Sequence, residues 1–189
     1  MDFYRNADKW GNRFEGVSYN QVTQVTKAPV EDEPLTLSEV KEWCKIDGTS
    51  EDAILTALII AAREICEQYT CVSFVQREFS CWLNNYNGST YLPYGPIRSV
   101  DAVYDENLNE VDFTLRTTDN GFAQINTPRM ILKVEYIGGY EAEKGDNELP
   151  EALRTALKAQ VLYLYENRGD AQDPISPIAA AILNQFKRV

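Results

Sequence analysis

The sequence predicts an α+β fold in which an N-terminal helical hairpin and C-terminal helices pack with a small antiparallel β meander. Apolar residues recur at helical spacing before residue 70 and again after residue 150. The stretch between them, 74–140, is rich in β-branched and aromatic residues separated by turn signals. With 189 residues and 44% hydrophobic content, the chain suits one domain of ordinary size plus extensions.

Residues 1–34 show no clear periodicity but contain several large aromatic side chains. We expect this segment to be an arm that docks on a neighbouring protein, because aromatic residues are enriched in protein interfaces. A loose tail and a self-contained subdomain are the alternatives. The predicted docking residues of the arm are Phe3, Tyr4, Trp10 and Phe14.

The first helix of the hairpin is expected at 37–45. Thr36 and Glu39 have the spacing of a capping box, in which each residue satisfies a backbone amide of the other. We expect Trp43, within this helix, to be a packing residue.

The second helix, expected at 51–70, is the element around which the rest is organised. One broad arc of it is apolar, formed by Ile54, Leu55, Leu58, Ile59, Ala61, Ala62, Ile65, Cys66 and Tyr69. The opposite side is polar, with Asp52, Thr56, Arg63, Glu64, Glu67 and Gln68, yet it also holds Ile60, with Ala53 and Ala57 beside it. A helix that is apolar almost all round is buried on more than one side, within one chain or between chains. We therefore predict a subunit interface at Ala53, Ala57 and Ile60.

The β region carries its best hairpin signal at Asp119-Asn120-Gly121, because Asn-Gly supplies the positive φ that a tight turn requires. Strand alternation is clearest at the end of the region, where one face is formed by Met130, Leu132, Val134 and Tyr136. We expect the opposite face of that sheet to be wet.

A third helix is expected at 150–167, with a leucine-rich stripe and a second face of small residues. Small side chains permit close approach of another backbone. We therefore add Ala152, Ala156 and Ala159 to the predicted subunit interface.

The last segment, 174–189, begins a short helix at Ser176 and spaces apolar residues by four. A helix this short does not persist alone, so it must dock on its own chain or on another. The predicted docking residues are Ile178, Ile182, Phe186, Lys187 and Arg188.

Composition excludes several functions. The formal net charge of -11 disfavours gripping DNA or RNA, and no apolar run reaches the roughly 18 residues that a membrane span needs. The chain has no histidine, no nucleotide-binding glycine loop and no CxxC pair among Cys44, Cys66, Cys71 and Cys81. We therefore expect no cofactor, no metal site and no enzymatic activity, and we expect a soluble protein made in a cytosol.

Several stretches resemble the head-to-tail connector family of tailed bacteriophages, also called adaptor or head-completion proteins. The similar stretches, in family order, are LTLSEVKEWCKIDGTSEDAILTALIIAAREICEQYT, LPYGPIRSVDAVYD, VEYIGGY and LPEALRTALKAQVLYLYENRGD. They cover roughly residues 35–170. The first 34 residues have no counterpart in this pattern, and the end of the chain resembles the family's closing helix only loosely.

The resemblance implies a structural virion protein that acts at the head-tail junction and is assembled in the host cell cytoplasm. About twelve copies would form a ring beneath the portal protein, extend the channel through which DNA passes, and offer a platform to the next neck or tail protein. Residues 35–173 would be the connector core, and 174–189 would dock on the portal.

Two other functions remain open at this point. One is a protein interaction module with no role in a virion, and the other is a hydrolase built on a pair of carboxylates. The abundance of Asp and Glu in an acidic chain reflects solvation more often than catalysis.

Overall fold

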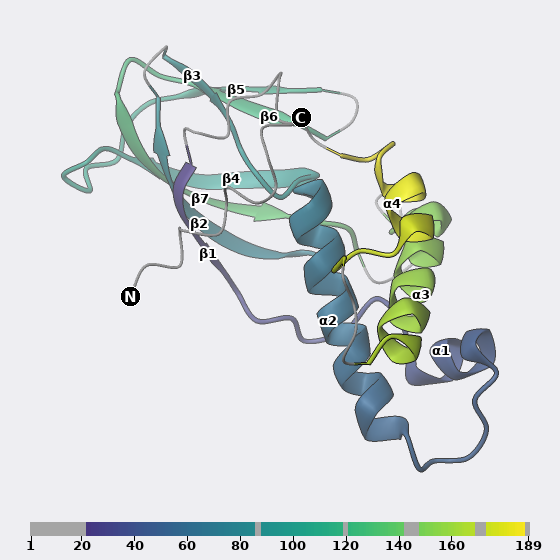
Figure 1. The fold of residues 1–189 in the computed structure, drawn as a ribbon. Helices are drawn as coiled ribbons and strands as arrows, with labels where there is room; N and C mark the ends of the chain where they lie inside the picture. The colour runs from purple at the N-terminus through teal and green to yellow at the C-terminus, as the bar shows by residue number, and fades with distance from the viewer. Residues whose placement is uncertain (1–21, 86–87, 119–120, 142–147, 169–172, 188–189) are drawn as a thin grey trace.

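The computed structural model describes residues 22–85, 88–118, 121–141, 148–168 and 173–187. The helices are α1 (Leu37–Cys44), α2 (Asp52–Thr70), α3 (Glu151–Glu166) and α4 (Pro177–Leu183). The strands are β1 (Val22–Lys27), β2 (Arg77–Asn84), β3 (Ser89–Tyr91), β4 (Ile97–Tyr104), β5 (Thr114–Thr117), β6 (Ala123–Asn126) and β7 (Ile131–Gly138). Figure 1 shows the helices gathered on one side of the molecule and the strands on the other. The predicted α+β class is confirmed.

The strands form two antiparallel sheets, with orders β1-β2-β7-β4 and β3-β6-β5. The predicted meander is therefore wrong, because a meander pairs consecutive strands, whereas β7 lies between β2 and β4. The register places Cys81 of β2 and Val103 of β4 on either side of Val134 in β7, and all three side chains are buried. Turn signals mark where strands end, but matching apolar faces decide which strands pair.

The two sheets enclose a strand core. Leu132, Val134 and Tyr136 are buried in it as the alternation predicts, whereas Met130 precedes β7 and is exposed. The predicted hairpin joins β5 to β6: the Gly121 amide donates to the Thr118 carbonyl at 2.9 Å, and Gly121 has a φ of 72°. Residues 119 and 120 lie outside the described residues.

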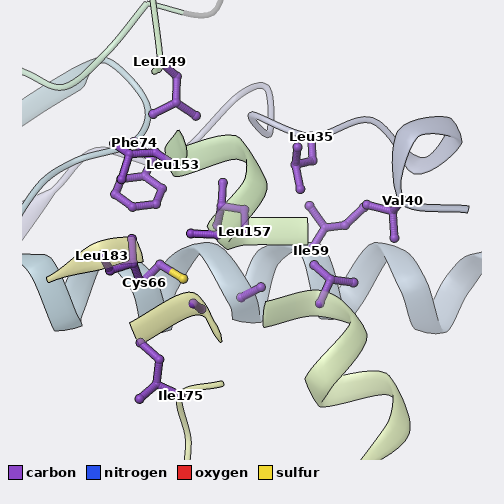
Figure 2. Packing of buried hydrophobic residues seen from close by; sticks show 14 of the residues in the cluster. Leu35, Val40, Ile59, Cys66, Phe74, Leu149, Leu153, Leu157, Ile175 and Leu183 are labelled. Atoms are coloured by element: carbon purple, nitrogen blue, oxygen red, sulfur yellow. The ribbon is translucent and has the colours of Figure 1, made fainter. Parts of the chain in front are cut away.

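A second core lies between the helices (Figure 2). Leu153 and Leu157 of α3 meet Ile59 and Cys66 of α2, and Leu183 of α4 closes the cluster. The entry to α1 is the predicted capping box: the Glu39 amide donates to Thr36 Oγ1 at 3.2 Å, and the Thr36 amide donates to Glu39 Oε2 at 2.8 Å. The helices thus pack mainly on each other.

The segment predicted to be an arm is partly built into the fold. Strand β1 pairs with β2 of the same chain, and Val22 and Val25 pack against the strand core. This corrects the arm boundary at residue 34. A register shift between Val22 and Gln24 breaks the alternation of two, which hides the strand from a periodicity search. The predicted arm contacts Phe3, Tyr4, Trp10 and Phe14 lie outside the described residues.

Candidate assembly surfaces

An apolar stripe on α2 faces solvent. Ala53, Ala57 and Ile60, the residues predicted for a subunit interface, are all exposed, and 40% of the Ile60 surface is accessible. Ile54, which the sequence assigns to the core, is also exposed. The reason is that α1 and α3 cover only the side of α2 that carries Leu55 and Ile59. We call Ala53, Ile54, Ala57 and Ile60 the α2 stripe.

The alanine face of α3 is divided. Ala152 is exposed, whereas Ala156 and Ala159 are buried inside their own chain. The prediction that all three contact a neighbouring subunit is therefore wrong for Ala156 and Ala159. Their small side chains do allow close approach of another backbone, but the helices that approach α3 are α1, α2 and α4 of the same chain.

The C-terminal segment docks on its own core. Ser176 Oγ caps α4 by accepting from the Ala179 amide at 3.4 Å, and Ala179 and Leu183 are fully buried. Gln160 of α3 fixes the entry to the helix: its Nε2 donates to the Pro174 carbonyl at 2.7 Å, and its Oε1 accepts from the Ser176 amide at 2.8 Å.

The predicted docking residues of this segment differ in exposure. Ile178 is 65% exposed, whereas Ile182 and Phe186 are half-buried against the helical core. The Lys187 ammonium lies 4.4 Å from the centre of the Tyr69 ring. Arg188 lies outside the described residues. Among the described residues of this segment, Ile178 is therefore the large apolar side chain most accessible to a partner.

A buried cluster of charged residues joins the two cores. The Glu67 carboxylate is 1% exposed and accepts from the Phe74 amide at 2.9 Å, Ser73 Oγ at 3.2 Å and Arg63 Nη1 at 3.3 Å. Arg77 Nη2 donates to the same carboxylate. Sequence reasoning missed this cluster, because Arg63 and Glu67 have the spacing of an ordinary ion pair on a helix surface.

The same cluster holds the segment that contains β1. Glu33 pairs with Arg63 through two hydrogen bonds of 2.8 and 3.1 Å. Lys27 Nζ lies 3.9 Å from Glu67 Oε2 and 3.5 Å from the centre of the Tyr94 ring. Loss of hydration on burial lowers the pKa of Lys27 to about 8, although the charge of Glu67 acts in the opposite direction. The cluster therefore stabilises the position of residues 27–33 against α2.

Two of the four thiols, those of Cys66 and Cys81, are buried packing groups. Burial raises the pKa of Cys66 and of Cys81 to about 12, so both stay protonated and unreactive at neutral pH. Across the part of the chain that the structure describes, no cluster of His, Cys, Asp and Glu side chains could hold a metal ion. In that same part, every helix is too short or too polar to cross a lipid bilayer.

Comparisons with known proteins place the chain in a family. A family model described as "Head completion protein" matches residues 33–189. Among solved structures, a chain from the neck of an empty GTA particle computed with C6 symmetry has a TM-score of 0.71 at 18% identity. Chains from the virion of a native gene transfer agent (GTA) particle and from a native GTA neck computed with C12 symmetry have TM-scores of 0.70 and 0.68 at 20% and 19% identity.

Each of these alignments covers 88% of this chain and 96% of the other, and at such identities the likeness concerns the fold. No curated protein shows significant sequence similarity to the chain. The family match covers the helical core, both sheets except β1, and the C-terminal segment. The chain belongs to the head completion protein family.

Proposed function

We propose that copies of this chain form a ring at the head-tail junction of a virion, beneath the portal protein, with about twelve subunits. The ring extends the DNA channel and gives the next neck or tail protein a platform. The observation that carries this proposal is the α2 stripe, which a single chain leaves in water although its side chains are apolar. The C6 and C12 symmetries of the similar necks support a ring.

The stripe suits the contacts that close a ring. In a ring, each subunit presents one surface to a different surface of its neighbour, so an apolar face on one side of the subunit meets an unrelated face of the next. Burying Ile54 and Ile60 in that contact removes two large side chains from water, which favours association.

The charge of the chain suits a conduit for DNA. A formal charge of -11 repels phosphate, so DNA passes a channel of this composition without specific binding. The role is structural rather than catalytic and needs no cofactor. The partners are further copies of the chain, the portal and a downstream neck or tail protein.

A charged substitution in the stripe tests the ring. Ile60→Asp places a carboxylate in the proposed contact, and we expect ring formation to fail while the circular dichroism spectrum stays that of the native protein. Glu64→Gln, an exposed change one turn away on the same helix, is the matched control. Normal rings of the Ile60→Asp protein in electron micrographs would refute the assigned contact.

The C-terminal docking surface must be tested with a substitution that leaves the helical core intact. Deletion of residues 175–189 removes Leu183 from the helical core, so loss of binding would report unfolding. Ile178→Ser instead leaves the buried contacts of α4 in place, and we expect weaker binding to purified portal protein with an unchanged melting temperature. Leu115→Ser, at an exposed leucine on strand β5, is the control. Equal portal binding by Ile178→Ser would remove Ile178 from the interface.

The N-terminal arm is proposed to strap a neighbouring subunit through Phe3, Tyr4, Trp10 and Phe14. Replacing Trp10 and Phe14 with Ala should weaken ring assembly, measured as the mass of the assembled species in light scattering. Unaltered assembly would count against the strap.

The virion role is tested by quantitative mass spectrometry of purified particles. We expect about a dozen copies of the chain for each particle. If the chain is missing from intact particles, the protein is an interaction module with another role.

A further inference from the structure

A second apolar surface lies at the far end of the strands. Leu108, Met130 and Ile131 are 58%, 59% and 37% exposed, and we call these three residues the distal patch. Tyr104 pairs with Lys133 near the start of β7, so the loop that follows β4 leaves the sheet beside residues 130 and 131. The other end of β7 leads back toward the helices. The distal patch is therefore separate from both the α2 stripe and α4.

The loop that carries Leu108 is held in one conformation. Asp105 Oδ1 accepts from the amides of Asn107 and Asn109, both at 2.9 Å. The Leu108 amide donates to the Asp105 carbonyl at 3.0 Å, and the Asp105 amide donates to the Asn109 carbonyl at 2.9 Å. The backbone of such a loop loses little conformational freedom on binding, which favours recognition.

Leu108 adopts a backbone conformation that leucine rarely takes. Its φ is 63°, in the left-handed region that glycine and asparagine occupy at lower cost. The leucine side chain gains little from packing against its own chain, because 58% of its surface lies in water. The turn between the bridged residues Tyr104 and Glu110 requires the positive φ, and the presence of leucine there, where glycine or asparagine would cost less, supports a role for its side chain in binding.

The surroundings of the patch are acidic. Glu106, Glu110 and Asp112 are exposed on the same loop. Arg129 is a basic neighbour, and its charge helps to lower the pKa of Asp105, but the carboxylates outnumber it. A second copy of this chain, with its net charge of -11, is a poor match for this surface. A partner whose apolar pocket is rimmed by Lys and Arg side chains matches both the leucine and the carboxylates.

We propose that the distal patch docks a different virion protein, one that presents an apolar pocket with a basic rim, and that Leu108 is inserted into that pocket. This inference rests on the proposed function, because it assumes a role in the neck. It adds a contact surface opposite to the end where α4 lies, as a protein that links two neighbours in a stack requires.

The test uses Leu108→Asn in the full-length protein. Asparagine tolerates a positive φ, so the turn is kept while the apolar side chain is removed. Wild type and variant are titrated separately with purified portal protein and with the purified downstream neck protein, in low and high salt. We expect affinity for one of the two to fall about tenfold or more, with no loss in melting temperature. Leu115→Asn, on strand β5, is the control and keeps wild-type affinity.

A charge reversal supplies an independent measurement. The double substitution Glu106→Lys and Glu110→Lys should lower the affinity for the same partner. Raising the salt concentration should likewise lower the affinity of the wild type. Stronger binding by the doubly substituted protein would refute the proposal that Lys and Arg side chains surround the partner's pocket.

Three results would overturn the docking proposal: wild type that binds neither protein, wild-type affinity of Leu108→Asn for both, or an effect of Leu108→Asn on ring formation, which would make a second copy the occupant. Mass spectrometry of particles separates these results from failure of the virion role: the chain is present in particles if only the docking proposal fails, and its absence from particles refutes the virion role itself.

Discussion

The two halves of α2 differ in which kinds of side chain they expose and bury. The N-terminal half leaves Ile54 and Ile60 in water, whereas the C-terminal half buries Arg63 and Glu67. Figure 1 shows the cause: the C-terminal half meets the sheets, and the N-terminal half extends away from them toward α1. Burial along this helix therefore follows the position of neighbouring elements, and a residue's own polarity is a poor guide to it.

The difference also separates two roles. The buried charges act within the chain, because they join α2 to β2 and to the segment around Lys27 and Glu33. The exposed apolar residues have no such contact and are available to another chain. Substitutions of the buried charges in the C-terminal half should thus affect folding, and substitutions in the α2 stripe should affect assembly.

The largest effect is expected for Glu67→Ala. It leaves Arg63, Arg77 and Lys27 without their shared carboxylate, and removing one partner from a buried charge network costs about 3–5 kcal/mol. Urea denaturation of the monomer measures the free energy of unfolding. Glu64→Gln is the control, since that carboxylate is exposed and should change stability by less than about 1 kcal/mol. A loss below 1 kcal/mol for Glu67→Ala would remove the assigned role of the cluster.

A second substitution sharpens the comparison within the N-terminal half. Leu55 is fully buried and lies five residues before Ile60. Leu55→Ala should lower the free energy of unfolding by about 2–5 kcal/mol, because it leaves a cavity in the helical core. The measurement is the same urea titration. A change under 1 kcal/mol would mean that this half of α2 is not packed on α1 and α3.

Local signals predicted much of the fold. The capping box at Thr36 and the turn at Gly121 each depend on a few adjacent residues, and both are present. The strand order could not be predicted, because β2 and β7 meet across 46 intervening residues and several other pairings satisfy the same alternation. Trp43 was expected to be a packing residue but is 45% exposed. In α1, which has only eight residues, Val40 is the buried residue, and a helix this short has too few apolar positions to show which of its faces is buried.

The candidate surfaces were predicted in part. Ile60 was singled out as a surface contact because an isoleucine among charged residues breaks the pattern of an amphipathic helix, and its side chain is indeed exposed. Ala156 and Ala159 were misassigned because small residues indicate close packing without indicating which chain packs there. The charged cluster was not predicted, because Lys27 and Glu33, which pair with Glu67 and Arg63, lie in a segment whose sequence shows no periodicity.

A smaller effect is expected from the titration of Lys27. Its pKa is about 8 in the folded chain and near 10.5 when unfolded, so between these values the unfolded chain holds a proton that the native chain has released. Stability conferred by this group therefore rises as the pH increases from 8 to 10.5. Relative to Lys27→Met, the wild type should gain about 1–2 kcal/mol over that range, because water screens part of the charge of the partly exposed ammonium. Parallel stability curves of the two proteins would contradict the assigned pKa.

The smallest effect is expected for Ile60→Ser, measured on the monomer below the concentration at which rings form. Because the side chain is 40% exposed and lies outside the helical core, its loss should change the free energy of unfolding by about 0.5 kcal/mol or less. The same substitution removes apolar area from the proposed contact, so the concentration needed for assembly should rise while monomer stability holds. A loss as large as that of Leu55→Ala would place Ile60 in the core and would make the two halves of α2 alike. A helix that tolerates serine at position 60 and not alanine at position 67 is one whose isoleucine lies outside the core and whose glutamate lies within it.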